Sequence, residues 1–256
     1  MSQLTLSLVQ FSPLWEDKNV NLTHLEDTFR KLPETDLILL PEMFATGFTM
    51  NVQEMGEPMD GLVVSWMISQ AEARKAMVAG SCIIAAEGGY YNRLICAFPD
   101  GAVQYYDKKH LFSMGEEHLY YTPGHERVTI TWKGWRIRPL ICYDLRFPVW
   151  SRNHDDYDLL IYLSNWPSPR HHVWKTLLVA RALENQCWCA GVNRTGTDGM
   201  KLDYSGDSGL VDPRGNAVWL GDAPSIYTAA LIKDDLTSFR KKFPVLNDRD
   251  PFELKD

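Results

Sequence analysis

The chain has 256 residues, of which 45% are hydrophobic and 23% charged, a composition typical of a globular protein with one large domain or two small ones. Its net charge of −7 and the lack of a Lys/Arg-rich block argue against a nucleic-acid-binding or anionic-membrane surface. No apolar run approaches the roughly 20 residues that a membrane-spanning helix needs, so we expect no membrane partner.

Predicted strands and helices alternate in the first half of the chain. Apolar residues recur at helical spacing in 21–32 and 61–76, which we predict to be helices. The short, mostly apolar run 36–40 is typical of a strand that is buried on both faces. Further strands are expected at 4–11, 78–86, 94–98 and 103–106.

The second half starts with an irregular segment at 110–124 and is richer in hairpin-like strands. Lys133-Gly134 indicates a turn between strands at 128–130 and 135–141, and a helix is expected at 173–185. Further strands are predicted at 159–163, 187–192, 208–211, 217–220 and 227–231. This order predicts one α/β domain over residues 1–256, with either one mixed sheet or two packed sheets, and a charged surface extension from about residue 237.

The five cysteines are few for this length and odd in number, which favours reduced thiols and a cytoplasmic protein. Cys187 and Cys189 are one residue apart, a poor match to zinc-ligand spacing, and the adjacent His171 and His172 would diverge on a helix. We therefore expect no metal site. The glycine motifs of nucleotide-binding proteins are also missing, so we expect no cofactor. Residues 1–6 contain no basic region and no small-residue cleavage site, so no signal peptide is expected.

Cys142 ends an apolar run and is followed by the polar residues Tyr143, Asp144 and Arg146. A cysteine sulfur attacks a carbonyl carbon well when its pKa is lowered or when a base lies beside it. Taken alone, such a cysteine is more often an inert core residue. The polar residues that follow it weigh against that interpretation.

A carboxylate and two lysines also stand at the ends of apolar segments. Glu42, shielded from water, could act as a general base near neutral pH, although an isolated glutamate is more often a solvated loop residue. Lys108 and Lys109 point opposite ways on an extended chain, so one of them could enter a site and stabilise a developing oxyanion. The residues themselves do not decide which lysine it is.

These three segments resemble the motifs of the carbon-nitrogen hydrolase (nitrilase) superfamily, whose catalytic glutamate, lysine and cysteine follow one another in this order. The glutamate belongs to a Pro-Glu pair, the lysine to Tyr-x-Lys-x-His-Leu and the cysteine to Cys-Tyr-Asp-x-Arg-Phe-Pro. The register of the second motif selects Lys108 over Lys109. The resemblance implies an α/β fold, an α-β-β-α sandwich of two mixed sheets, and a homodimer.

Four further motifs occur in the family's order. A second glutamate lies six residues before a Pro-Gly pair, which places it at Glu117 and not at Glu116. The other three are Asn165-Trp166-Pro167, Arg181-Ala182-Leu183-Glu184-Asn185, and Gly206-Asp207-Ser208 with Asp212-Pro213-Arg214-Gly215. Seven short motifs in the right order are much more specific than any one of them.

The segment 147–152 is most similar to bacterial omega-amidases. The resemblance implies hydrolysis of the distal amide of dicarboxylate monoamides, such as 2-oxoglutaramate and succinamate, to an acid and ammonia. In the implied mechanism, Cys142 forms a thioester, Glu42 transfers protons, and Glu117 positions Lys108 and the substrate amide. The oxyanion is stabilised by Lys108 and by the backbone N–H of Tyr143.

The residues that recognise the substrate stay open. An arginine is the usual partner of a carboxylate, and Arg146, Arg170 and Arg194 all lie near the motif loops. Asn165 and Trp166 are further candidates for binding the substrate or the oxyanion, and Trp166 could also form part of the pocket wall. The alternatives are a nitrilase, a carbamoylase or a metabolite-repair amidase of the same superfamily, or a scaffold that binds without catalysis.

Overall fold

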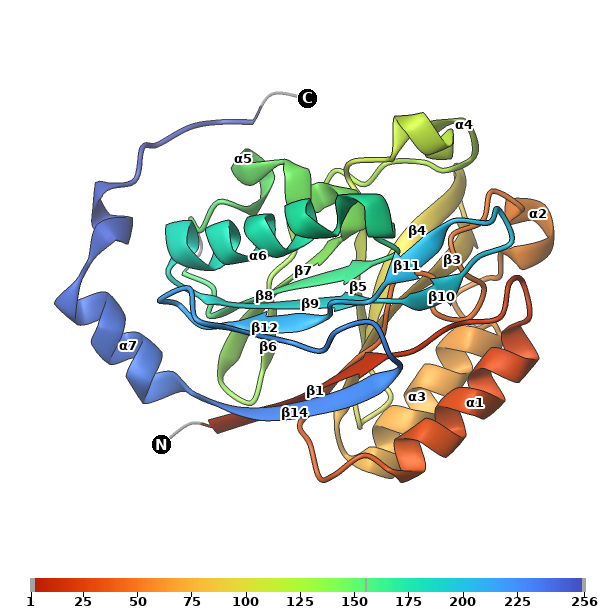
Figure 1. The fold of residues 1–256 in the computed structure, drawn as a ribbon, viewed down its shortest axis with the longest axis horizontal. Coiled ribbons are helices and arrows are strands. Elements are labelled where there is room, and N and C mark those ends of the chain that lie inside the picture. The colour runs from red at the N-terminus through yellow and green to blue at the C-terminus, as the bar shows by residue number, and fades with distance from the viewer. Residues whose placement is uncertain (1–2, 155, 255–256) are drawn as a thin grey trace.

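Two six-stranded sheets dominate the computed structural model, which describes residues 3–154 and 156–254 (Figure 1). The first sheet, in the order β14-β1-β2-β3-β4-β5, contains β1 (Gln3–Gln10), β2 (Leu37–Leu39), β3 (Met77–Ala86), β4 (Gly89–Ala97), β5 (Val103–Asp107) and β14 (Ser225–Ile232). The second, in the order β13-β12-β9-β8-β7-β6, contains β6 (Ile130–Trp132), β7 (Trp135–Ile141), β8 (Leu159–Ser164), β9 (Trp188–Asn193), β12 (Gly209–Val211) and β13 (Ala217–Trp219). A separate hairpin pairs β10 (Thr195–Thr197) with β11 (Asp203–Ser205).

Each sheet has a parallel centre and antiparallel edges. Strands β1, β2 and β3 run parallel, and β14, β4 and β5 are antiparallel to their neighbours. In the second sheet β7, β8 and β9 run parallel, and β6, β12 and β13 complete it in antiparallel pairs. Of the two arrangements that the sequence left open, the structure therefore has two sheets. Ligands of α/β proteins usually bind beyond the carboxyl ends of such parallel strands.

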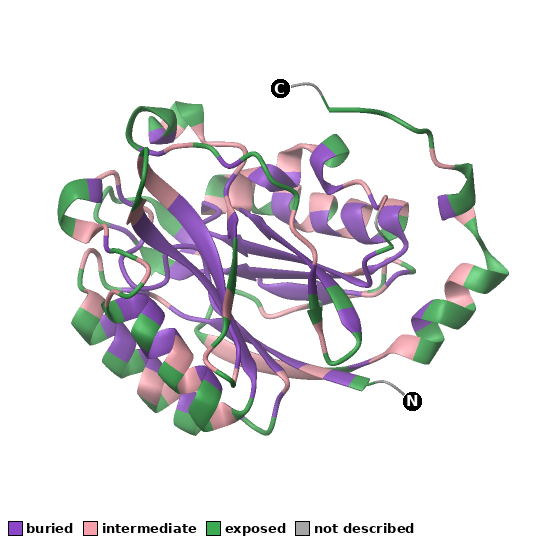
Figure 2. Cartoon of the chain, turned by 180° about the vertical axis from the view of Figure 1, so that it is seen from behind, coloured by how far each residue is buried: buried purple, intermediate pink, exposed green. Residues whose placement is uncertain are grey.

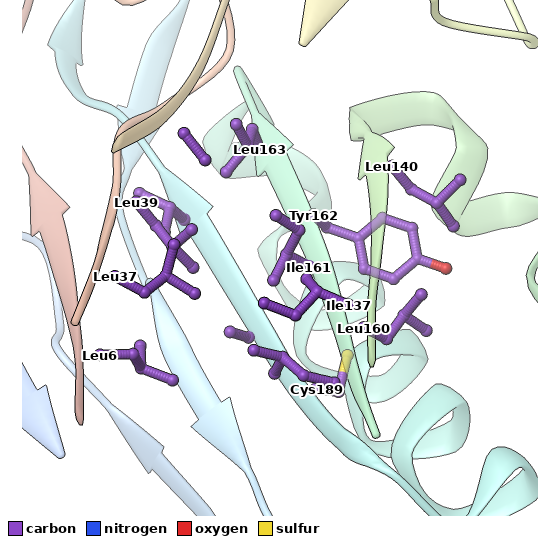
Figure 3. Close-up of a cluster of buried hydrophobic side chains, with 14 of the residues drawn as sticks. Leu6, Leu37, Leu39, Ile137, Leu140, Leu160, Ile161, Tyr162, Leu163 and Cys189 are labelled. Carbon is purple, nitrogen blue, oxygen red and sulfur yellow. The ribbon is translucent and has the colours of Figure 1, made fainter. Parts of the chain in front are cut away.

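The main hydrophobic core lies between the two sheets. Figure 3 shows side chains of β1 and β2 pointing toward those of β7 and β8. The residues that meet there include Leu6, Leu37, Leu39, Ile137, Ile161 and Leu163, none of which is exposed to solvent. Burying one such side chain stabilises the folded state by roughly 1.5–3 kcal/mol. The interface between the sheets is therefore a large part of the free energy of folding.

Helices cover the outer faces of both sheets (Figure 1). Because side chains alternate along a strand, Ile38 of β2 points away from Leu37 and Leu39 and packs with Leu25 and Phe29 of α1. The second sheet carries α6 on its other face, where Trp174 and Leu178 are buried. The helices are α1 (Lys18–Arg30), α2 (Val52–Met55), α3 (Leu62–Arg74), α4 (Glu117–Tyr120), α5 (Pro148–Ser151), α6 (His171–Asn185) and α7 (Lys233–Lys242). The predicted α-β-β-α order is confirmed.

The long helices and the central strands lie where the sequence predicts them. The strand expected at 94–98 was predicted too short, since β4 begins at Gly89. The prediction stopped at residue 94 because Asn92 and Arg93 are polar, but both residues are buried within the strand. The segment 110–124 is not wholly irregular but contains a 3-10 helix (Ser113–Gly115) and α4. Lys133 and Gly134 both have positive φ, as a tight hairpin turn requires.

The segment from residue 237 begins inside α7 and continues as a largely exposed chain along one edge of the molecule (Figure 2). Met1 and Ser2 of the N-terminal segment, and Lys255 and Asp256 at the end of the expected extension, lie outside the described residues. Within the described ranges, no helix combines the length and the apolar character that crossing a bilayer requires.

Candidate active site

Four of the predicted site residues lie at or shortly after the carboxyl ends of strands, at one end of the sheets. Glu42 lies three residues beyond β2, Lys108 follows β5, Cys142 follows β7 and Asn165 follows β8. Hydrogen bonds join residues of the two sheets here, since Glu42 contacts Lys108 on one side and Asn165 on the other. The packing of the sheets therefore brings together side chains that are far apart in the sequence.

A buried cluster of two carboxylates and one ammonium forms the centre of this region. Lys108 Nζ donates to Glu42 Oε1 at 2.8 Å and to Glu117 Oε1 and Oε2 at 3.0 and 2.9 Å. The three side chains are at most 1% exposed. The structure thus places Lys108 in the cluster and Lys109 outside it, beside His125. Glu117 is buried in the same way, whereas Glu116 is exposed.

The charges of the cluster follow from its burial. Burial alone would lower the pKa of Lys108, but the carboxylates of Glu117 and Glu42 outweigh it and hold this pKa above its ordinary value. The pKa of Glu117 is raised, first by burial and then by the charge of Glu42, against the opposing effect of Lys108. Lys108 therefore stays charged, and Glu117 binds a proton more readily than an exposed glutamate does.

Cys142 stands at the start of a 3-10 helix (Cys142–Arg146) in a strained conformation. Its φ is +42°, in the left-handed region that residues with a Cβ rarely adopt. Its sulfur lies 3.8 Å from the carbonyl oxygen of Asn165. Burial, and then the charge of Glu42, raises the pKa of the thiol well above its usual range, although Lys108 opposes this. The thiol is therefore neutral in the resting state and needs a base to become a nucleophile.

Asp144 fixes the turn that carries Cys142 to the segment that follows Lys108. Its carboxylate accepts hydrogen bonds from the backbone N–H groups of Ile141 and His110, at 3.0 Å each, and from the hydroxyl of Tyr106 at 2.8 Å. The same carboxylate lies 2.8 Å from the imidazole Nδ1 of His110. Asp144 is fully buried, so these bonds lock the relative positions of the two segments.

A cavity of about 500 Å³ opens onto the cluster. Its lining includes Glu42, Lys108 and Cys142, together with the four residues predicted to bind the substrate or the oxyanion: Tyr143, Arg146, Asn165 and Trp166. Aromatic side chains form much of the remaining wall. The structure thus brings seven of the eight predicted side chains into one pocket; the eighth, Glu117, contacts Lys108 but does not line the cavity.

The three candidate arginines differ in whether they line the cavity. The guanidinium of Arg146 lies 5.1 Å from the ring centre of Trp166 and that of Arg170 lies 5.7 Å from the ring centre of Phe112, and both residues line the cavity. No carboxylate in the described part of the chain forms an ion pair with either guanidinium. Arg194 is fully buried and donates to the backbone carbonyl oxygens of Pro13, Thr195 and Thr197, outside the cavity lining. Arg146 and Arg170 are therefore the candidates for binding an anionic group.

The sequence interpretation missed Asn92 and Ser81. Asn92 Nδ2 donates to Glu42 Oε1 at 2.8 Å and to Glu117 Oε1 at 3.1 Å, and Asn92 Oδ1 accepts from Ser81 Oγ at 2.9 Å. The one available signal was a lone amide beside a predicted strand. That strand was expected to start at residue 94, so Asn92 was assigned to no element.

The cavity contains no evident metal site, because no group of three or more His, Cys, Asp or Glu side chains among residues 3–154 and 156–254 could hold an ion. All five cysteines are unpaired.

A model of the carbon-nitrogen hydrolase family matches residues 5–241. The chain belongs to the carbon-nitrogen hydrolase family. Omega-amidase YafV of Escherichia coli (strain K12) is 44% identical over 99% of this chain and 100% of its own length, and 2-oxoglutaramate amidase of Bacillus subtilis (strain 168) is 32% identical over 95% and 96%.

A crystal structure in the same superfamily confirms the fold of this carbon-nitrogen hydrolase. XC1258 from Xanthomonas campestris, described as a CN-hydrolase superfamily protein with an arsenic adduct in its active site, superposes with a TM-score of 0.97 and 44% identity over 100% of both chains. The family membership expected from the seven motifs is thus confirmed. The individual roles of Glu42, Lys108, Cys142 and Glu117 stay predictions.

Proposed function

We propose that this carbon-nitrogen hydrolase is an omega-amidase, which hydrolyses the distal amide of small dicarboxylate monoamides to an acid and ammonia. The observation that carries the proposal is the buried Glu42–Lys108–Glu117 cluster beside Cys142, at a cavity lined by two arginines that have no carboxylate partner among the described residues. The similarity to two amidases along nearly the whole chain supports the same reaction class.

Acylation begins with a proton transfer. Glu42 removes the thiol proton of Cys142 as the sulfur attacks the amide carbon, and the carbonyl oxygen becomes an oxyanion. Lys108 and the backbone N–H of Tyr143 stabilise this oxyanion. Glu42 then gives its proton to the leaving nitrogen, the C–N bond breaks and ammonia departs. The acyl group stays on Cys142 as a thioester.

Deacylation uses the same groups with water in place of the thiol. Glu42 accepts a proton from water, whose oxygen attacks the thioester carbon, and the C–S bond then breaks as the proton returns to sulfur. Glu117 keeps Lys108 in place throughout, because it accepts two of the hydrogen bonds of the ammonium. Its Oε2 is itself held by the backbone N–H of Phe112 at 2.6 Å.

Ammonia release from the purified protein tests the proposal. Succinamate and 2-oxoglutaramate are expected to react faster than glutamine, asparagine, a nitrile or a carbamoyl amine. A preference for the nitrile or the carbamoyl amine would assign the chain to another branch of the family. No turnover of any of these compounds, together with no thioester trapped on Cys142, would support a binding scaffold instead.

We propose that Arg146 binds the substrate carboxylate, which lies at the opposite end of the substrate from the amide. Arg146→Ala should lower kcat/KM for succinamate about 10- to 100-fold, because hydrogen bonds to a charged group contribute about 1.5–3 kcal/mol. The matched control is butyramide, which has a similar length but no carboxylate, and its hydrolysis should change little. Equal losses for both amides would mean that Arg146 supports the fold of the site and not substrate recognition; the same pair of assays on Arg170→Ala tests the second arginine.

The proposal also includes one catalytic domain over residues 1–256, a cytoplasmic location and a homodimer. The unpaired cysteines support a reducing compartment. Val149 on α5 and Leu183 on α6 are each 47% exposed, which leaves these apolar side chains available to contact a second copy. Light scattering on the purified protein would contradict the dimer if it gave the mass of one chain at micromolar concentration.

A further inference from the structure

Asn92 of β4 contacts all three members of the buried cluster. Its Nδ2 donates to Glu42 Oε1 and Glu117 Oε1, and its backbone carbonyl oxygen accepts the backbone N–H of Lys108 at 3.0 Å. The residue is 1% exposed, so no bulk water competes for these bonds. Asn92 therefore connects two carboxylates and the backbone of the lysine from a single position.

The orientation of the Asn92 amide is fixed by its neighbours. The backbone N–H of Met43 donates to Ser81 Oγ at 2.8 Å, so the hydroxyl proton of Ser81 is free to point toward Asn92 Oδ1, 2.9 Å away. An amide whose oxygen accepts this proton must turn its NH₂ group toward the glutamates. Both N–H groups of Asn92 are then used, one for each carboxylate.

This arrangement leaves the two oxygens of Glu42 in different states. Oε1 accepts from Lys108 and from Asn92, each at 2.8 Å, which uses both of its lone pairs. Oε2 accepts from the backbone N–H of Asn165 at 2.8 Å and, more weakly, from the side-chain amide of Asn165 at 3.4 Å. Oε2 therefore keeps more capacity for a further proton than Oε1.

We propose that Asn92, oriented by Ser81, is a positioning residue that saturates Oε1 of Glu42 and so directs Oε2 to take the thiol proton of Cys142. The expected effect on kcat rests on the proposed function, whereas the hydrogen bonds of Asn92 do not depend on it. Two buried carboxylates share one ammonium in this cluster, and the two N–H groups of Asn92 lie between them and reduce their repulsion.

The test compares Asn92→Ala and Ser81→Ala with the wild type in two assays. The first is the rate at which acrylamide alkylates Cys142, followed by mass spectrometry as a function of pH. In this reaction the sulfur bonds to the β-carbon of acrylamide, and the thiol proton passes through Glu42 and ends on the α-carbon. The second assay is kcat and KM for succinamate. The titratable groups that face Asn92 or its partners are Glu42, Glu117, Lys108, Cys142 and Tyr121.

Asn92→Ala should lower kcat about 10- to 100-fold with little change in KM, because it removes a hydrogen bond from the ionised form of each carboxylate. For the same reason the acid limb of the alkylation profile should move to higher pH. Ser81→Ala keeps the amide but frees its orientation, so it should shift both readouts in the same direction by a smaller amount. If Asn92→Ala fails to fold, the alkylation profile and the kcat of Ser81→Ala test the proposal in its place.

Asn153→Ala is the matched control. Asn153 is also fully buried, but its side chain donates to the backbone carbonyl oxygens of Tyr157 and Asn185, and it does not line the cavity. It should lower the melting temperature and leave the acid limb in place. Profiles of Asn92→Ala and Ser81→Ala that superpose on the wild type would overturn the proposal. A wild type that alkylates as expected but does not hydrolyse succinamate would reject the proposed substrate, and the shift in alkylation would still establish the role of Asn92.

Discussion

Replacement of Cys142 by alanine is expected to reduce amide hydrolysis by at least about 10³-fold and to leave the protein folded. Cys142 is the one cysteine among the described residues that line the cavity, and the covalent route passes through its sulfur. Cys142→Ser should be nearly as inactive, because a hydroxyl is far harder to deprotonate than a thiol. Ammonia release from succinamate measures activity, and circular dichroism confirms folding.

Cys96→Ala is the matched control for the loss of a thiol. Cys96 is fully buried in β4, and burial raises the pKa of its thiol to about 12. Cys96→Ala should therefore lower the melting temperature through a small cavity but retain hydrolysis. If Cys142→Ala retained more than a few per cent of the wild-type activity, a thioester intermediate would be excluded, and Glu42 would instead have to activate water directly.

The sequence predicted the strands best where a single local rule decides the structure. The run Leu37–Leu39 is apolar on both faces because it lies between a helical layer and the second sheet, and this burial is visible in the residues themselves. Residues 94–97 of β4 were found for the same reason. Its first part was missed because the polar residues Asn92 and Arg93 satisfy their hydrogen-bonding groups through partners that are distant in the sequence.

The residues of the site divide in the same way, into those that a pattern in the sequence identifies and those whose contacts only the packed structure creates. Glu42, Lys108, Cys142 and Glu117 were selected by resemblance to family motifs, since no property of one isolated glutamate or cysteine separates a catalytic residue from a core residue. Asp144 stood inside such a motif, yet its function as a buried acceptor depends on Tyr106 and His110, which only the packed structure brings to it. Arg194 could not be separated from Arg146 by position in the chain, because the difference lies in which way the two side chains point.

Glu42→Gln is expected to reduce hydrolysis by at least about 10³-fold, nearly as much as the loss of the nucleophile. The thiol of Cys142 is neutral because burial raises its pKa well above the usual range, so attack depends on a base within reach. Glutamine has the shape of glutamate but cannot take the proton. The same change should slow alkylation of Cys142 by acrylamide near pH 7, and raising the pH should partly restore it, because hydroxide can then replace the missing base.

A second consequence of Glu42→Gln separates it from a simple loss of charge. Both carboxylate oxygens of Glu42 accept hydrogen bonds: Oε1 accepts from Lys108 and Asn92, and Oε2 accepts from Asn165. The NH₂ group of a glutamine at this position must therefore point at an N–H group. An unmatched buried donor costs about 1–3 kcal/mol, and urea denaturation should show this loss of stability.

Glu57→Gln is the matched control: Glu57 is 8% exposed, accepts from the backbone N–H of Val63 and from Lys18, and does not line the cavity. It should lose stability in the same way and keep its activity, so an equal loss of activity in both variants would mean that Glu42 supports the fold and does not transfer protons.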